Sequence, residues 1–318
     1  MFTIGIDLGG TNIAAGLVDA AGNLVCKKSV PTLRDRDHTD IIKDMAMLSF
    51  KVAEEAGVDM KQIHSIGIGS PGTPDIPRGI IVYANNLNFR NVPMAAEMNK
   101  YIQLPVHIDN DANCAALAES RAGAAKGHKH SVTITIGTGI GSGVIIDGRI
   151  YSGFNNAAAE MGHMVILSGG ELCTCGRLGC WEAYASATAL IRQTRQAAMV
   201  DSHSKINNLV EGNLDRVDAK TAFDAARIGD ETGKQVVDQF IFYLADGVVN
   251  LINIFQPEVL VVGGGVCKEG ETLLGPLREL VRKSAYTREE VPQTQIRVAQ
   301  LGNDAGIVGA ALLGRQTE

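Results

Sequence analysis

The apolar positions of the chain follow two spacings. Short runs rich in Ile, Val and Leu, such as 63–69 and 259–262, predict strands, and the run at 259–262 predicts a buried one. Longer stretches with apolar residues three and four positions apart predict amphipathic helices. These helices are expected at 40–56, 112–122, 181–198, 234–255, 273–284 and 305–314, and further strands at 82–83, 105–108 and 296–299. Strands that alternate with helices indicate an α/β fold.

Two segments repeat one pattern. Residues 4–19 and 134–147 each contain an apolar strand, a glycine-rich turn, a second apolar strand and an aspartate turn into a third strand. Glycines let backbone N–H groups approach an anion closely, and Thr11 and Thr138 add hydroxyl donors. Such turns are common in proteins that bind no ligand, and a Walker A motif is absent. The duplication and a third glycine run at 263–265 nevertheless favour a nucleotide held between two lobes.

Composition narrows the function classes. The chain has 318 residues, 45% hydrophobic and 20% charged, as expected for a globular protein of one large or two medium domains. The net charge of -6 argues against a nucleic-acid partner. The apolar runs have the length of strands, so we expect no membrane span. The first residues lack the features of a signal peptide, which predicts a cytoplasmic protein.

Three cysteines lie within eight positions, and a histidine lies ten residues before the first of them. Cys173, Cys175, Cys180 and His163 have the spacing of a tetrahedral Cys3His zinc site. Four protein ligands leave no open position, which indicates a structural zinc. A disulfide or ordinary buried thiols are the alternative, but a Cys-x-Cys pair is cramped for a disulfide. Without a secretory context, clustered cysteines favour metal binding.

A glutamate lies near each end of the zinc motif. Glu160 precedes His163, and Glu182 follows Cys180. The metal is therefore expected to hold two carboxylates in one place, where they bind the substrate. The other cysteines, Cys26, Cys114 and Cys267, are expected to be small core residues.

Several motifs together resemble the ROK family of sugar kinases and repressors, in the pattern most similar to its bacterial glucokinases. These motifs are Asp7-Leu8-Gly9-Gly10-Thr11, Asn110-Asp111-Ala112-Asn113, Gly137-Thr138-Gly139-Ile140-Gly141, Glu160-Met161-Gly162-His163, the cysteine motif from Cys173 to Glu182, and Gly263-Gly264-Gly265. The resemblance covers essentially the whole chain. It implies the actin-like ATPase fold, with a ribonuclease-H-like βββαβα unit in each of two lobes, and a homodimer.

The resemblance also implies the extent of the lobes. Residues 1–118 and 302–318 would form a small lobe that the C-terminal helix completes. Residues 119–301 would form a large lobe with the zinc loop and the adenosine site.

The implied reaction transfers the γ-phosphoryl group of ATP to the 6-hydroxyl of a hexose, with glucose as the first candidate. Asp111 resembles the catalytic base, with Asp109 as its neighbouring rival. Asp111 could also serve only as a helix N-cap. Asp7 resembles the carboxylate that holds hydrated Mg2+, and its alternative is to cap the following turn.

The same resemblance assigns the binding residues. The phosphate contacts are Gly9, Gly10, Thr11, Asn12, Thr138 and Gly139, and the adenosine contacts are Gly264 and Gly265, where any side chain would collide with the ligand. The sugar contacts are Gly72, Asn86, Asn110, Asp111, Glu160, His163 and Glu182.

Other functions remain open at this point. A kinase for N-acetylmannosamine, allose or fructose fits the same motifs, as does polyphosphate as the donor. Repressors of the family carry a winged helix before the first glycine loop, and a loop that starts at residue 7 leaves no room for one. Trp181 stands where the family most often has leucine, and we expect its indole in the core behind the zinc loop or at a subunit contact. Residues 202–218 are expected to form an irregular surface segment.

Overall fold

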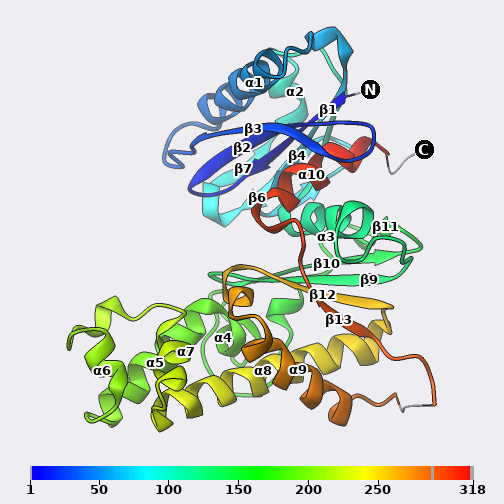
Figure 1. Ribbon diagram of the computed structural model, residues 1–318. Coiled ribbons are helices and arrows are strands. Elements are labelled where there is room, and N and C mark those ends of the chain that lie inside the picture. Colours follow the sequence, from blue (N-terminus) through cyan, green and yellow to red (C-terminus); the bar gives the residue numbers. More distant parts are fainter. Residues whose placement is uncertain (1, 288–289, 316–318) are drawn as a thin grey trace. The chain divides into compact units, whose positions relative to one another are not determined.

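The computed structural model describes residues 2–287 and 290–315. The chain forms two compact units (Figure 1). The first comprises Met1–Thr133, Gly143–Ala159 and Ala299–Glu318, and the second comprises Ile134–Ser142 and Glu160–Val298. Relative to the lobes expected from the sequence, the first unit also takes in residues 119–133, 143–159 and 299–301.

The first sheet has the strand order β3-β2-β1-β4-β8. Its strands are β1 (Phe2–Leu8), β2 (Asn12–Val18), β3 (Leu24–Pro31), β4 (Ile63–Ser70) and β8 (Val106–Asn110). The first three strands are antiparallel neighbours, whereas β4 and β8 run parallel to β1. The carboxyl ends of β1, β4 and β8 therefore meet at one edge. This sheet is covered by α1 (His38–Glu55), α3 (Asp111–Ala122) and α10 (Ala305–Leu312).

The second sheet repeats this order. It runs β11-β10-β9-β12-β13, again with the third, second, first, fourth and fifth strands of its half side by side. Its strands are β9 (Ser131–Ile136), β10 (Ile140–Ile146), β11 (Arg149–Ile150), β12 (Val259–Gly263) and β13 (Gln295–Val298). The predicted duplication is thus confirmed. A small sheet of β5 (Thr73–Asp75), β6 (Ile80–Ala84) and β7 (Phe89–Val92) and the short helix α2 (Met94–Met98) belong to the first half.

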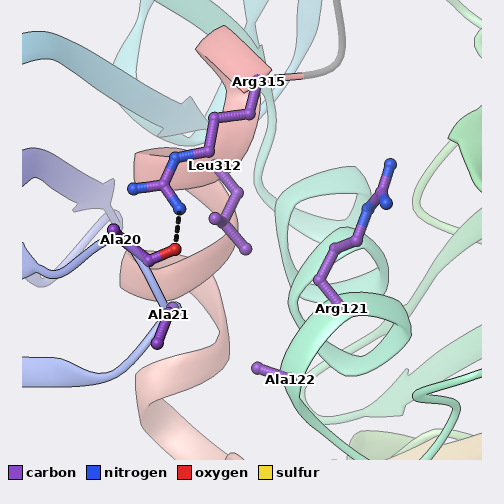
Figure 2. Close-up of a pocket in the computed structure, with 7 residues that line it drawn as sticks. Ala20, Ala21, Arg121, Ala122, Leu312 and Arg315 are labelled. Atoms are coloured by element: carbon purple, nitrogen blue, oxygen red, sulfur yellow. Dashed lines mark hydrogen bonds between the residues drawn. The ribbon is translucent and has the colours of Figure 1, made fainter. Parts of the chain in front are cut away.

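The last helix packs closely on the first sheet. A Cβ atom at Gly5 would lie 1.8 Å from the carbonyl oxygen of Ile307, and one at Gly67 would lie 1.7 Å from that of Ala310. Glycine at these two strand positions therefore lets α10 rest directly on the sheet beside α3 (Figure 1). After α10, the guanidinium of Arg315 donates to the carbonyls of Ala20 (2.8 Å) and Asp19 (3.0 Å), beside a pocket of about 230 Å³ (Figure 2).

The second unit is rich in helices. These are α4 (Glu182–Ala185), α5 (Ala187–Val200), α6 (Lys205–Leu209), α7 (Thr221–Arg227), α8 (Glu231–Phe255) and α9 (Glu271–Ser284). Short 3-10 turns occur in both units, at Met60–Gln62, Asn85–Leu87, Met161–His163, Leu214–Arg216, Gly265–Glu269, Gly302–Asp304 and Leu313–Arg315. By length and composition alone, α8 could cross a membrane, contrary to the expectation that no segment could. Its buried face packs against α4, α5, α7 and α9, as the core helix of a globular unit does.

Two expectations about the second unit are wrong. The helix expected over 181–198 is two helices, because Ser186 adopts an extended backbone and its hydroxyl accepts a hydrogen bond from the N–H of Ala189 (3.1 Å). The segment 202–218 is not irregular, since it contains α6 and a 3-10 turn. Ile206 of α6 is fully buried and anchors the segment.

Candidate functional site

Acidic side chains gather at the carboxyl ends of the parallel strands of the first sheet. Asp7 of β1 pairs with Gly69 of β4, which in turn pairs with Asp109 of β8. Helix α3 begins at Asp111, directly after β8. The register of three strands therefore brings the predicted Asp7, Asp109 and Asp111 to one place.

The two rival aspartates have different surroundings. Asp109 is 3% exposed, and its Oδ1 accepts hydrogen bonds from the side chain of Asn113 (2.9 Å) and the N–H of Asn110 (2.7 Å). Asp111 is only partly buried, and its Oδ1 accepts from the N–H of Ala112 (2.9 Å). Burial raises the pKa of both carboxyls. Asp111 is thus the one that retains contact with solvent.

The alternative reading of Asp111 as a helix N-cap is wrong. Asn110 caps α3, and its Oδ1 accepts from the N–H groups of Ala112 (2.8 Å) and Asn113 (3.4 Å). Its Nδ2 donates to the carbonyl of Gly72 (3.1 Å). The capping role therefore falls on the neighbouring residue, and it fixes Asn110 against the loop that contains Gly72.

Asp7, like Asp111, is partly buried. Burial, together with the charge of Asp111, raises the pKa of Asp7 to about 6. The start of α10 lies close by, because a Cβ atom at Gly306 would lie 2.5 Å from Oδ2 of Asp7. A buried carboxylate is costly as an anion unless a cation or hydrogen bonds compensate it. The environment of Asp7 therefore suits a carboxylate that faces a bound cation.

The first glycine loop joins β1 to β2. Its N–H at Gly9 donates to the carbonyl of Asn12 (2.9 Å), and the hydroxyl of Thr32 donates to the carbonyl of Gly9 (2.6 Å). Thr11 and Asn12 are exposed. A Cβ atom at Gly10 would lie 3.7 Å from that of Asn86, so this loop lies beside the 3-10 turn that carries Asn86.

Gly72 has a specific backbone requirement. Its φ of +94° is unfavourable for other residues, and a Cβ atom there would lie 2.0 Å from the carbonyl oxygen of Tyr83. Gly72, Asn86 and Asn110 therefore line the part of the first unit that also holds the acidic cluster.

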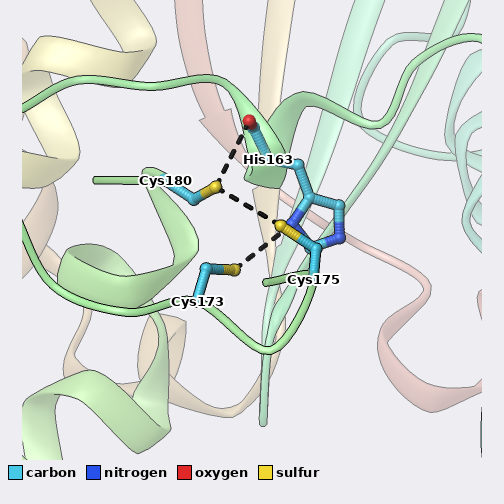
Figure 3. A group of neighbouring side chains, drawn as sticks. All are labelled: His163, Cys173, Cys175 and Cys180. Carbon is cyan, nitrogen blue, oxygen red and sulfur yellow. Dashed lines mark hydrogen bonds between the residues drawn. The ribbon is translucent and has the colours of Figure 1, made fainter. Parts of the chain in front are cut away.

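The predicted zinc ligands come together in the second unit (Figure 3). The four ligand atoms of His163, Cys173, Cys175 and Cys180 lie within 4.8 Å of one another. Nδ1 of His163 is 3.5 Å from Sγ of Cys173, and the Sγ atoms of Cys175 and Cys180 are 3.6 Å apart. Around a tetrahedral zinc with its usual bond lengths, a nitrogen and a sulfur ligand are about 3.5 Å apart and two sulfur ligands are about 3.8 Å apart. The residues therefore fit a zinc ion.

The loop that carries these ligands folds by short-range backbone bonds. The N–H of Cys173 donates to the carbonyl of Arg177 (2.8 Å), and that of Gly176 donates to Cys173 (2.9 Å). Gly179 has a φ of +87°, and a Cβ atom there would lie 1.8 Å from the carbonyl oxygen of Leu167. Trp181 follows, and its buried indole donates to the carbonyl of Tyr243 on α8 (2.9 Å). The expectation of an indole in the core is confirmed.

The second glycine loop lies against the end of the zinc motif. Oε2 of Glu182 accepts from the N–H of Ile140 (2.9 Å), while its Oε1 accepts from the hydroxyl of Thr174 (3.1 Å). Thr138, at the tip of the loop, is exposed. Glu160 is also exposed, and its carbonyl accepts from the N–H of His163 (3.1 Å).

The third glycine run, residues 263–265, has a backbone requirement of its own. We expected a side chain at Gly264 or Gly265 to collide with a ligand. A Cβ atom at Gly264 would already lie 2.2 Å from the carbonyl oxygen of Ile136 without any ligand, and the φ of Gly264 is +95°. Gly264 is therefore explained by the fold of the second unit itself. Gly265 faces open space.

The predicted site residues thus divide between the two units. The first unit holds Asp7, Gly9, Gly10, Thr11, Asn12, Gly72, Asn86, Asn110 and Asp111, and the second holds Thr138, Gly139, Glu160, His163, Glu182, Gly264 and Gly265. Sequence reasoning missed Asn113, which bonds to Asp109, and Gly306, which approaches Asp7. It also gave no role to Thr174. A glycine at the start of an apolar helix was the available signal for Gly306. Of the remaining cysteines, Cys114 and Cys267 are buried and Cys26 is partly buried.

Comparison with known proteins identifies a family and related structures for this chain. The ROK family matches residues 3–317. A glucokinase of Thermotoga maritima is 39% identical over 309 residues, which cover 97% of this chain and 95% of that protein. A ROK family glucokinase from Streptomyces griseus, solved in complex with glucose and AMPPNP, aligns with a TM-score of 0.84 at 37% identity over 99% of this chain and 100% of that one.

The family also contains regulators. A xylose repressor of Bacillus subtilis is 30% identical over 288 residues, which cover 90% of this chain and 70% of the repressor. The match over almost the whole length, the duplicated sheet order and the Cys3His cluster agree with one another. This chain belongs to the ROK family and has its actin-like sugar kinase fold.

Proposed function

We propose that this protein is a glucokinase, which transfers the γ-phosphoryl group of ATP to the 6-hydroxyl of D-glucose. The observation that carries the proposal is the cluster of aspartates at the carboxyl ends of β1 and β8. There two partly buried aspartates, Asp7 and Asp111, lie close together within a chain that is 39% identical to a glucokinase. Asp111 suits the role of proton acceptor, and Asp7 suits the role of a carboxylate that faces a bound cation.

Asp111 is the proposed base. Phosphoryl transfer depends mainly on positioning and on neutralising charge, so the base has only to accept a proton as the new bond forms. Asp109 is less suited to this role, because Asn113 and the backbone of Asn110 already occupy its Oδ1. Burial raises the pKa of Asp111, which makes its carboxylate a better proton acceptor.

Asp7 is the residue proposed to hold hydrated Mg2+, which neutralises phosphate charge when it is bound. The two glycine loops supply N–H and hydroxyl donors for the phosphates, from Gly9, Gly10, Thr11, Asn12, Thr138 and Gly139. Gly265 is the proposed neighbour of adenosine, since a side chain there would enter open space. Gly264 would serve adenosine only by shaping that turn.

Glucose would be recognised by paired hydrogen bonds from carboxylates and amides. Asn110 and Asp111, with Gly72 and Asn86, are proposed for the end that carries the 6-hydroxyl. Glu160, Glu182 and the zinc ligand His163 are proposed for the other hydroxyls. Cysteine coordination would fix these three residues relative to one another. We further propose that the protein acts as a cytoplasmic homodimer, in which Trp181 plays no part because its indole is buried within its own unit.

The test is an ADP-release assay with ATP and a panel of hexoses, which includes glucose, mannose, fructose, allose and N-acetylmannosamine. Glucose is expected to give the highest kcat/KM. Polyphosphate in place of ATP tests the donor. A higher kcat/KM for another hexose would reassign the substrate within the sugar kinases. Saturable glucose binding without ADP release would favour a sugar sensor, as in the repressors of the family.

A further inference from the structure

One carboxylate touches both the zinc loop and the second glycine loop. We propose that Glu182 is a positioning residue for the nucleotide, because it holds the phosphate-binding turn, residues 137–141, in its binding conformation. The inference rests on the proposed function, which assigns ATP phosphates to this turn. It adds a second role to a residue otherwise proposed only as a sugar contact.

The two oxygens of Glu182 have different partners. Oε2 accepts from the backbone N–H of Ile140 (2.9 Å), and Oε1 accepts from the hydroxyl of Thr174 in the zinc loop (3.1 Å). A bond from an N–H to an ionised carboxylate is about twice as strong as a neutral one. Because Glu182 follows the candidate zinc ligand Cys180 by two residues, bound zinc would restrain the backbone of Glu182. The turn would thereby be restrained through Glu182.

The shape of the turn leaves room for this carboxylate. A Cβ atom at Gly139 would lie 2.2 Å from Oε2 of Glu182. Gly139 does not have a positive φ, so its backbone conformation would accept other residues. A side chain is excluded there only because the carboxylate of Glu182 occupies the position of its Cβ atom. Alanine at this position would therefore displace the carboxylate from Ile140.

Other residues that flank the zinc motif hold the same turn. The N–H of Ala187 donates to the carbonyl of Gly137 (2.9 Å). On the opposite flank, a Cβ atom at Gly162 would lie 2.5 Å from the carbonyl oxygen of Ile140. Segments on both sides of the cysteines thus contact the turn, and Glu182 supplies the only side-chain hydrogen bond among these three contacts.

A carboxylate has about four acceptor positions, so the bonds to Ile140 and Thr174 leave others for a sugar hydroxyl. Glu182 can therefore hold the turn and contact sugar together. The two roles separate in the absence of sugar, because a residue that only binds sugar has no effect on nucleotide affinity when no sugar is present.

The experiment measures MgADP binding by calorimetry without any sugar. Glu182→Ala and Gly139→Ala are expected to weaken binding by about tenfold or more, since each removes a charge-assisted hydrogen bond at the turn. Glu182→Gln keeps one acceptor and should lie between wild type and Glu182→Ala. Glu171→Gln, on the same loop, is the matched control and should bind MgADP like wild type. Hydrogen exchange of a peptide that contains Ile140 should be faster in Glu182→Ala and Gly139→Ala.

The zinc content of each variant is measured alongside. If Glu182→Ala loses zinc, Gly139→Ala is judged by its MgADP affinity together with the hydrogen exchange at Ile140, because Gly139 lies outside the ligand motif but is itself a proposed phosphate contact. Unchanged MgADP affinity in Gly139→Ala with zinc retained would overturn the inference while leaving the proposed function intact. Failure of wild-type protein to bind MgADP would overturn the proposed function and this inference with it.

Discussion

At the scale of the residue, neighbouring aspartates differ through their partners. Asn113 and the N–H of Asn110 hold Asp109, whereas Asp111 has one bond to the backbone and retains solvent contact. Asn110, and not Asp111, caps α3. The sequence predicts that these aspartates lie close together. It cannot predict which of them accepts hydrogen bonds from Asn110 and Asn113, because those bonds depend on the conformation of the first turn of α3.

Asp111→Asn is expected to bind glucose but to lose about a thousandfold or more in kcat, the range typical of losing a general base. Asparagine keeps the size and hydrogen bonding of the side chain without accepting a proton. Calorimetry with glucose and steady-state ADP release measure the two effects. Asp215→Asn, on an exposed turn of the second unit, is the control. A kcat within tenfold of wild type would rule out Asp111 as the base.

Asp7 gives a prediction for pH. Its pKa is 3.8 in a model peptide and about 6 in the folded chain, chiefly because of burial. Between these two pH values, Asp7 is more often protonated in the folded protein than in the unfolded chain. Its contribution to the free energy of unfolding therefore falls as the pH rises through this range, and does not fall further at higher pH. In magnesium-free buffer, the free energy of unfolding of wild type should therefore decline from pH 4 to pH 6 relative to that of Asp7→Asn.

Chemical denaturation across this range measures the difference between the two proteins. Carboxylates that do not interact with Asp7 titrate in both proteins and cancel, whereas Asp111 interacts electrostatically with Asp7 and contributes to the difference. Stability curves that stay parallel from pH 4 to pH 6 would show that Asp7 is not held in its costly buried state.

At the scale of the element, the zinc loop is the part that the sequence predicts best. Its ligands lie close together in the chain, so spacing alone defines the cluster. The bond from Glu182 to Ile140 spans 42 residues and has no such signal. The interruption between α4 and α5 at Ser186 also cannot be predicted from the sequence, because the helical spacing of apolar residues continues through this position.

Removal of zinc tests this element. Cys175→Ser is expected to lower the melting temperature and to weaken glucose binding, since the binding energy of a structural zinc is also folding energy. Elemental analysis of the wild type should give one zinc per chain. Cys26→Ser, a cysteine outside the cluster, is the comparison and should keep its zinc. Protein purified without chelators that contains no zinc would contradict the zinc-loop account.

A second element contact can be tested through Trp181. A Cβ atom at Gly247 of α8 would lie 2.0 Å from the indole, so Gly247→Ala overpacks the core behind the zinc loop. We expect a loss of about 1–3 kcal/mol in unfolding free energy. Gly275→Ala, in α9, is the matched control, because its nearest neighbour is 3.8 Å away and alanine favours helices. Equal stability of the two variants in denaturant titrations would contradict this packing.

At the scale of the whole molecule, the internal duplication is what the sequence reveals most fully. Two glycine-rich hairpins at 4–19 and 134–147 predicted two related halves, and both sheets have the same strand order. The limits of the compact units were harder to predict, because β9 and β10 each have residues in both units. The alternation of strands and helices in the sequence predicts the secondary structure, but it does not predict at which residue one compact unit ends and the other begins.

Activity toward hexoses tests the central claim most directly. The measurement is ADP release from ATP with each hexose of the panel, by wild type and by Asp111→Asn. The account predicts the highest kcat/KM for glucose in the wild type and, with every sugar, a loss of about a thousandfold or more in kcat for the variant. Glucose-dependent ADP release by Asp111→Asn at the wild-type rate, or none by wild type with any hexose, would contradict it.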